Sequence, residues 1–348
     1  MSLPDTQVVR RALGGFNMGS ASEIRRFGDG LIHDTYFVEV GLHRYVLQRV
    51  NRIFAASVHA NIQAVTTHLH QRGVVSPRLL DSEQGRPWLD CGAEGVWRLM
   101  TFVEGATRHV LDSPAEARSV GGTLGRFHTG LKDLRYDFVA ARPPGHDRAR
   151  YLQALRGAMA RHSAHRCLAE VVSLARPLLE TVERVRPVSE VPDVVAHGDP
   201  KLSNILFHAD RSEAYCLVDL DTVGPGVWAL ELGDAWRSWC AGSEIGGEAP
   251  TFDLTLFAAS WAGYCAEVEG AVDRGSSEAL VLAPEWICLE LALRFGADAL
   301  EERYFAWDTR RYDSASEHNL ARARWQWALH AVLVDNRDAR RDVLRSHR

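Results

Sequence analysis

The sequence has no close pairs of cysteines, no long apolar run and no excess of one charge. Its six cysteines lie far apart and include no C-x-x-C motif, which excludes a disulfide scaffold and favours a reduced, cytoplasmic chain. The longest weakly polar stretch, residues 254–265, has about 12 residues, too few to cross a bilayer, and the first residues lack the apolar core of a signal peptide. With 40 Lys and Arg against 45 Asp and Glu, the net charge of −5 predicts no nucleic-acid or membrane partner.

What the sequence does contain is a change of pattern about a third of the way along. A short opening helix is expected at 8–15, and later residues rich in β-branched and aromatic types predict strands around a helix at about 56–72. The expected strands are residues 24–27, 35–40, 45–50 and 96–103. After residue 104 the apolar spacing is mainly helical, with a strand-rich stretch within 194–220.

The 348 residues therefore predict an α+β protein with two unequal lobes. A small antiparallel β-sheet lobe with one helix is expected at residues 1–103. A large, mainly helical lobe is expected at residues 104–348.

The densest chemical information lies in VAHGDPKLSNILF, residues 195–207, followed by YCLVDLD, residues 215–221. The spacing of His197, Asp199 and Asn204 is that of a kinase catalytic loop, H-x-D-x-x-x-x-N, and Asp219 ends the next apolar run. Phosphoryl transfer needs a carboxylate for the attacking hydroxyl, oxygen ligands for Mg²⁺, and positive charge on the phosphoryl oxygens. Asp199, the pair Asn204 and Asp219, and Lys201 would supply them in that order. A bare H-x-D is more often part of a turn, but the full string favours catalysis.

In these motifs and in others, the sequence resembles the aminoglycoside phosphotransferase and choline kinase-like family, and within it the N-acetylhexosamine 1-kinases. The matching strings are FGDGLIHDTYFV (27–38), YVLQRVN (45–51), VWRLMTFVEG (96–105), HGDPKLSNILF (197–207), VDLDTVGPG (218–226), ELGDAWRS (231–238), LALRFGADAL (291–300) and EHNLARAR (317–324). The resemblance implies a bilobal protein-kinase-like fold with ATP and Mg²⁺ as cofactors. It also implies Asp199 as the catalytic base, Asn204 and Asp219 as metal ligands, and Asp221 as a possible further ligand.

The expected nucleotide site departs from the usual pattern at one position. Gly28 and Gly30 lie where a glycine-rich loop would cover the phosphates, although G-D-G is equally an ordinary hairpin turn. A kinase-like enzyme carries a lysine on its third strand, paired with a glutamate on the next helix. Here the strand carries Gln48, and the helix offers no carboxylate. Either Gln48 contacts the phosphates as an amide while Lys201, Arg49 or Mg²⁺ supplies the charge, or the protein is a degraded kinase.

The adenine is expected where the two lobes join. By topology it would lie against the backbone of Thr101, Phe102 and Val103, although MTFV equally suits a plain core strand.

The resemblance also indicates an acceptor site. Its candidate residues are His33, Asp199, Asp219, Arg294 and Tyr304. An arginine at position 294 is unusual on an apolar helix face, but a salt bridge to Glu290 or Asp298 would explain it equally well. The related sugar kinases carry a histidine after G-D-G, where this chain has Leu31.

Together these observations predict a kinase that transfers the γ-phosphate of ATP to a hydroxyl of a small molecule. The expected acceptor is the anomeric hydroxyl of an N-acetylhexosamine or a related sugar. Two alternatives remain: a kinase for an aminoglycoside, an amino alcohol or another natural product, and a pseudokinase that binds nucleotide without turnover. The neutral Gln48 favours the pseudokinase, whereas the intact Asp199, Asn204 and Asp219 argue against it.

Overall fold

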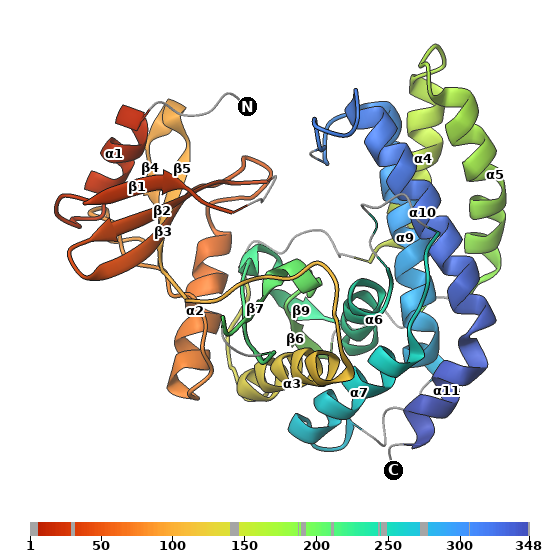
Figure 1. Ribbon diagram of the computed structural model, residues 1–348. Helices are drawn as coiled ribbons and strands as arrows, with labels where there is room; N and C mark the ends of the chain where they lie inside the picture. Colours follow the sequence, from red (N-terminus) through yellow and green to blue (C-terminus); the bar gives the residue numbers. More distant parts are fainter. Residues whose placement is uncertain are drawn as a thin grey trace.

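The computed structural model places the chain in a small N-terminal lobe and a larger helical lobe (Figure 1). It describes residues 6–28, 32–139, 146–186, 188, 193–209, 212–242, 244, 249–271, 278–305 and 307–346. In this part of the chain, none of the helices is both long and apolar enough to cross a membrane. All six cysteines are free thiols, as their spacing predicts.

The small lobe is a five-stranded antiparallel sheet with two helices. Its elements are α1 (Thr6–Gly14), β1 (Glu23–Arg26), β2 (Asp34–Val40), β3 (His43–Arg49), α2 (Val58–Gln71), β4 (Leu89–Asp90), the 3₁₀ turn η1 (Gly92–Glu94) and β5 (Val96–Thr101). The strand order is β1-β2-β3-β5-β4. The predicted antiparallel sheet with its helix α2 is confirmed, and α1 is a second helix in this lobe.

One face of the sheet is closed by α1. Alternate residues of the central strands point to this face, including Leu47 on β3 and Trp97 and Leu99 on β5, all fully buried. They pack against Val9 and Leu13 of α1 in one apolar cluster. Because side chains alternate along a strand, the intervening residues of β3 and β5 point to the opposite face, towards the large lobe.

The large lobe surrounds two small two-stranded sheets with helices. Its elements are α3 (Pro114–Leu131), α4 (Arg148–Arg161), α5 (Leu168–Arg184), β6 (Val194–Ala196), the 3₁₀ turn η2 (Leu202–Asn204), β7 (Ile205–Phe207), β8 (Ala214–Leu217), the 3₁₀ turn η3 (Leu220–Thr222), β9 (Gly224–Gly226), α6 (Trp228–Trp239), α7 (Leu254–Glu267), α9 (Glu278–Glu301), α10 (Ala315–Asp335) and α11 (Arg337–Ser346). Strand β6 pairs with β9, and β7 pairs with β8.

The segments predicted to carry the chemistry, residues 197–204 and 218–223, connect the strands of these sheets, and the surrounding helices pack against the sheets. The core contains the fully buried rings of Trp236, Trp239, Trp261 and Phe257 from α6 and α7. Beyond β5, the chain passes directly beside this region, because Ala106 forms an antiparallel bridge with Phe207 of β7. The strand-rich stretch inside a helical lobe is therefore present as predicted.

Helices α3 and α7 cross at unusually short range. A Cβ atom added at Gly121 would lie 1.9 Å from the carbonyl oxygen of Ser260, and one added at Gly263 would lie 1.9 Å from that of Arg118. Real Cβ atoms do not approach backbone oxygens so closely, and so both positions require glycine. Since α3 also packs against β8, this crossing supports the region that carries Asp219.

We expect Gly121→Ala to lower the free energy of unfolding by about 1–3 kcal/mol, because the added methyl group forces the two helices apart. Chemical denaturation measures the effect. The matched control is Gly14→Ala at the end of α1, where an added Cβ meets nothing within 4 Å. The control should be neutral or slightly stabilising, and an equal loss in both variants would contradict the close crossing.

Candidate active site

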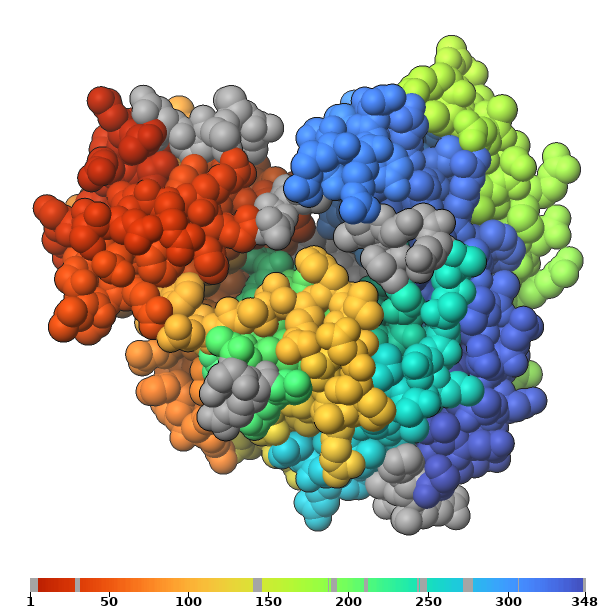
Figure 2. All heavy atoms as spheres, in the orientation of Figure 1, coloured from red at the N-terminus to blue at the C-terminus, as the bar shows by residue number. Residues whose placement is uncertain are grey.

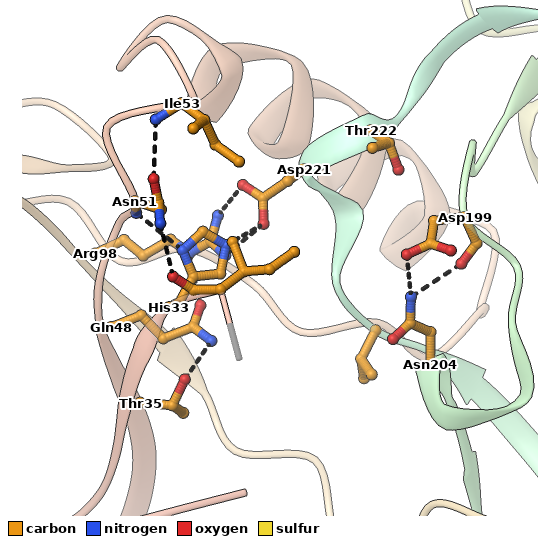
Figure 3. Close-up of polar contacts among 12 residues, drawn as sticks. His33, Thr35, Gln48, Asn51, Ile53, Arg98, Asp199, Asn204, Asp221 and Thr222 are labelled. Atoms are coloured by element: carbon orange, nitrogen blue, oxygen red, sulfur yellow. Dashed lines mark hydrogen bonds and ion pairs between the residues drawn. The ribbon is translucent and has the colours of Figure 1, made fainter. Parts of the chain in front are cut away.

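Asp199, Lys201 and Asn204 come together in the loop between β6 and β7. Lys201 Nζ lies 2.5 Å from Asp199 Oδ2. Asn204 Nδ2 donates to the backbone oxygen of Asp199 at 2.9 Å and to its Oδ2 at 3.2 Å (Figure 3). The amide nitrogen of Asn204 is thus used within the loop, which leaves its amide oxygen for another partner. Burial alone would raise the pKa of Asp199, but the Lys201 ammonium brings this pKa below its ordinary value. The Asp199 carboxylate is therefore ionised at neutral pH.

Helix α6 fixes the shape of this loop. The Glu231 carboxylate accepts hydrogen bonds from the backbone N–H groups of His197, at 2.7 Å, and Gly198, at 3.0 Å. Gly198 has φ +81°, and a Cβ there would lie 2.7 Å from the carbonyl oxygen of Thr222, so that only glycine fits. Trp239 Nε1 donates to the carbonyl of Pro200 at 2.9 Å. No sequence pattern indicates this role of Glu231, because its partners lie more than 30 positions away.

Asp219 follows β8 in a strained conformation. Its φ of 66° and ψ of 57° are left-handed, which is uncommon for a residue other than glycine and concentrates at functional sites. Burial and the negative charge of Asp221 raise the pKa of the Asp219 carboxyl. Ligand atoms of His33, Asp219 and Asp221 lie within 4.8 Å of one another. Partly buried carboxylates at this spacing repel each other, and so this turn is suited to a bound cation.

Asp221 forms a buried ion pair with Arg98 of the small lobe. Arg98 of β5 donates through Nη1 and Nη2 to the two carboxylate oxygens of Asp221, at 2.6 and 2.7 Å. Burial would raise the pKa of Asp221, but Arg98 and His33 hold it well below its ordinary value. Asp221, expected as a further metal ligand, therefore has both oxygens engaged and its charge balanced.

His33 belongs to the same group. The backbone N–H of Asn51 donates to His33 Nδ1 at 3.1 Å, so that the ring proton is on Nε2, which lies 3.1 Å from Asp221 Oδ2 (Figure 3). Both ring nitrogens are thus engaged within the protein. The expected contact between His33 and an acceptor has no free ring nitrogen to make it.

Gln48 also contacts Arg98. The two residues are directly opposite in the β3–β5 register, and Arg98 Nε donates to Gln48 Oε1 at 2.8 Å. Gln48 Nε2 in turn donates to Thr35 Oγ1 at 2.9 Å. Arg49 is paired with Asp34, at 2.6 Å. The buried cation beside Gln48 is therefore Arg98, which the sequence reasoning missed, although an arginine inside the apolar string VWRLM was a visible signal.

The adenine site is predicted at the junction between the lobes, and the structure describes the backbone of this segment. The N–H groups of Thr101 and Phe102 donate to the carbonyls of Arg78, at 2.9 Å, and Arg44, at 3.1 Å. The next residue, Val103, forms no backbone hydrogen bond with the described part of the chain. Its N–H and carbonyl are thus available to a planar ligand.

The predicted phosphate loop lies partly outside the described residues, which exclude Gly30 and Leu31. Gly28 is exposed and has φ +75° with no atom near an added Cβ. This backbone conformation favours glycine. The role of this loop towards the phosphates stays a prediction.

Arg294 and Tyr304 come together on the other side of the site. The Arg294 guanidinium lies 5.3 Å from the ring centre of Tyr151, 5.8 Å from that of Tyr304 and 5.4 Å from that of Phe305. It also donates to Glu290, at 3.4 Å, so the salt bridge expected as the alternative is present.

Asp234 of α6 interacts electrostatically both with Arg294 of this cluster and with Asp199 of the loop between β6 and β7. The pKa of Asp234 is raised by burial and by the charge of Asp199, against the opposing effects of Arg237 and His146. Burial lowers the pKa of Arg294, but negative charges around it, Glu290 foremost and Asp234 among them, raise this pKa.

In space-filling view the surface is hollowed between the small lobe, in red, and the C-terminal helices, in blue (Figure 2).

Known proteins match this chain in family and in fold. Residues 23–267 match the model of a family described as the phosphotransferase enzyme family. A solved aminoglycoside phosphotransferase from Alicyclobacillus acidocaldarius is 19% identical, with 97% of this chain and 98% of that chain covered and a TM-score of 0.61. A choline kinase from Cryptosporidium parvum is 13% identical, with 95% and 97% covered and a TM-score of 0.63. An amicoumacin kinase in complex with AMP-PNP, Ca²⁺ and its antibiotic is 14% identical, with 94% of each chain covered and a TM-score of 0.63.

These three structures show the kinase-like fold, and the family match covers the lobe junction, the catalytic loop and the Asp219 turn. With its fold and its predicted loop in agreement, the chain is a member of the phosphotransferase enzyme family.

Proposed function

We propose that this phosphotransferase uses ATP and Mg²⁺ to phosphorylate a hydroxyl of a small molecule, and that the acceptor is a sugar. The observation that carries the proposal is the juxtaposition of Asp199 with Lys201 and Asn204 beside the strained turn at Asp219. Phosphoryl transfer depends on positioning and on charge stabilisation, and these four side chains provide both.

Asp199 orients the acceptor. Its ionised carboxylate would accept the hydrogen bond of the attacking hydroxyl and take its proton as the new O–P bond forms. Lys201 holds the carboxylate in place and brings a positive charge to the position where the transferring phosphoryl oxygens would lie.

The donor set fits Mg²⁺. The Asp219 carboxylate is a hard oxygen ligand, and so is the amide oxygen of Asn204, which accepts no hydrogen bond from the described residues. Burial and, after it, the negative charge of Asp221 raise the pKa of Asp219, and a bound cation would offset both effects. When bound, Mg²⁺ neutralises charge on the nucleotide phosphates. We assign its protein ligands to Asn204 and Asp219, whereas Asp221 would act mainly through Arg98.

ATP would lie between the lobes. Val103 would offer its backbone N–H and carbonyl to the adenine edge, and Thr101 and Phe102 position this segment by their hydrogen bonds to Arg78 and to Arg44 of β3. Gly28 and Gly30 would cover the phosphates. The division into lobes after Val103 would then run through the nucleotide site.

The charges on the acceptor side favour a neutral, hydroxylated acceptor. Asp234 is paired with Arg237, and Glu290 with both Arg294 and His146. A polycationic aminoglycoside would need unpaired carboxylates, because each of its ammonium groups must be matched when it leaves water. Arginine and aromatic rings instead suit the hydroxyl groups and the ring face of a sugar. This supports a neutral sugar as the acceptor, and the resemblance implies further that the sugar is an N-acetylhexosamine or a relative, phosphorylated at its anomeric hydroxyl.

Two alternatives are kept. Solved structures of similar fold include an aminopropanol kinase as well as the choline and amicoumacin kinases, so an amino alcohol or another natural product is the second candidate acceptor. The pseudokinase alternative rested on the neutral Gln48. It loses that support because Arg98 provides a buried cation at the same place.

Replacing the proposed base tests the chemistry. We expect Asp199→Asn to lower kcat by ~10²–10⁴-fold with little change in the KM for ATP, because the hydroxyl loses its proton acceptor while the nucleotide contacts remain. Steady-state ATP consumption measures both constants. The control is Asp133→Asn, which removes an exposed carboxylate paired with His68 and should leave kcat unchanged. Full turnover by Asp199→Asn on every accepted acceptor would exclude the assigned role.

A panel of acceptors tests the substrate class. With ATP and Mg²⁺, we expect turnover with N-acetylhexosamines, none with kanamycin or choline, and a ³¹P NMR signal of an anomeric phosphate in the product. The reason is that the carboxylates of the acceptor side are already paired. Turnover with the polycation alone would contradict the sugar assignment but not the kinase activity. Thermal stabilisation by nucleotide with no turnover on any acceptor would favour the pseudokinase.

A further inference from the structure

Kinase-like enzymes place a lysine on the third strand and pair it with a glutamate on the following helix. In this chain both positions are changed, because β3 carries Gln48 and α2 contains no Asp or Glu. The place beside Gln48 is nevertheless charged. The Arg98 side chain projects into it from the neighbouring strand and is 2% exposed.

Every donor group of Arg98 has a defined partner. Its Nε donates to Gln48, and its two terminal nitrogens form a bidentate pair with Asp221 (Figure 3). Such fork-to-carboxylate pairs fix the orientation of both side chains. Because both partners are buried, loss of either would leave an uncompensated charge away from water.

Asp221 is not part of the small lobe. It lies in the 3₁₀ turn η3, two residues after Asp219, and this turn belongs to the large lobe. His33 donates to the same carboxylate from the segment before β2. Two segments of the small lobe therefore hold the turn that carries the proposed metal ligand.

The same contacts explain why position 48 is not a lysine. The Gln48 amide accepts from Arg98 through its oxygen and donates to Thr35 through its nitrogen. A lysine ammonium has three donors and no acceptor. It would place a second positive charge against the Arg98 guanidinium, and so the two cations exclude each other.

We propose that the Arg98–Asp221 pair replaces the lysine–glutamate pair of kinase-like enzymes, and that Arg98 is a positioning residue for the Asp219 turn. Compared with those enzymes, the cation lies on β5 instead of β3, and its carboxylate partner lies in the large lobe instead of on the helix after β3. The pair thus connects the lobes directly, where the usual pair lies within the small lobe. This rests on the proposed binding of nucleotide and metal.

The pair also sets the charge that the nucleotide meets. With Arg98 in place, the charge of Asp221 is neutralised, whereas Asp219 forms no ion pair within the described part of the chain. Without Arg98, Asp221 would keep its hydrogen bond with His33 but lose its cation, which would leave a second uncompensated negative charge within 4.8 Å of Asp219. Such a site attracts a free divalent cation more strongly but repels the phosphates of a nucleotide.

A charge relocation tests the proposal. The variants are Arg98→Gln, Gln48→Lys, and the double variant that carries both. In the double variant the cation returns to β3, and since a lysine side chain is one bond longer than glutamine, it extends towards Asp221. Binding of Mg·ATP is followed by the nucleotide dependence of the melting temperature, which needs no acceptor. A failed acceptor panel and a failed relocation are therefore distinguishable.

We expect Arg98→Gln to weaken Mg·ATP binding by about tenfold or more and to lower turnover by ~10²-fold, because the metal turn is displaced. Free Mn²⁺ should bind this variant more tightly than the wild type, a change that mere loss of packing would not produce. Gln48→Lys should also bind Mg·ATP weakly, and the double variant should bind it better than either single variant.

The matched control is Arg126→Gln, which removes an arginine paired with Glu267 between α3 and α7 and should leave Mg·ATP binding unchanged. If Arg98→Gln does not fold, Arg98→Lys keeps the charge without the fork and should show a smaller loss of the same sign. The proposal is overturned if the Arg98 variant that folds binds Mg·ATP as the wild type does. A double variant no better than both single variants would overturn it as well.

Discussion

A buried ion pair between Arg98 and Asp221 joins the two lobes of this protein at the point where its chemistry is proposed to occur. Removing two charges from water is costly, and such a pair persists only when the remaining donors and acceptors are satisfied. Gln48 meets that condition by accepting the hydrogen bond of Arg98 Nε–H, and His33 meets it by donating a hydrogen bond to Asp221 Oδ2. The contact between Gln48 and Arg98 depends on the register of β3 and β5, which sets the two residues directly opposite each other.

The site is thus held from two directions. Helix α6 holds the catalytic loop through the Glu231 carboxylate, whose two backbone hydrogen bonds fix the residues before Asp199. The small lobe holds the Asp219 turn through Asp221. Between these two supports, Asp199 and Asn204 are in direct contact. Rigid support of this kind is what positioning catalysis requires, since small displacements of reacting groups are expensive.

Local patterns predicted most of the elements and the catalytic loop. The strand-rich stretch within 194–220 and the convergence of Asp199, Lys201 and Asn204 follow from periodicity and spacing, which are short-range properties. Residues that act across long sequence separations were not predictable in the same way. Arg98 and Asp221 lie 123 positions apart, and His33 and Asp221 lie 188 apart, so no local pattern records that they meet.

The departures from prediction have a common cause. Gln48 was interpreted as a phosphate contact or a sign of decay, because the compensating arginine lies on another strand. The acceptor role of His33 stays a prediction, but no local pattern indicates its hydrogen bonds with Asn51 and Asp221. Arg294 forms the predicted salt bridge to Glu290 and also lies near the Tyr304 ring, while its role towards an acceptor stays a prediction.

The most direct test of the account is a double-mutant cycle on Arg98 and Asp221, read out as the dissociation constant of Mg·ATP. If the two residues act as one unit, Arg98→Gln combined with Asp221→Asn should bind Mg·ATP no more weakly than the worse single variant, because removal of both charges leaves none unpaired. Losses that simply multiply would show that the residues act independently, and would contradict the claim that this pair positions the metal turn.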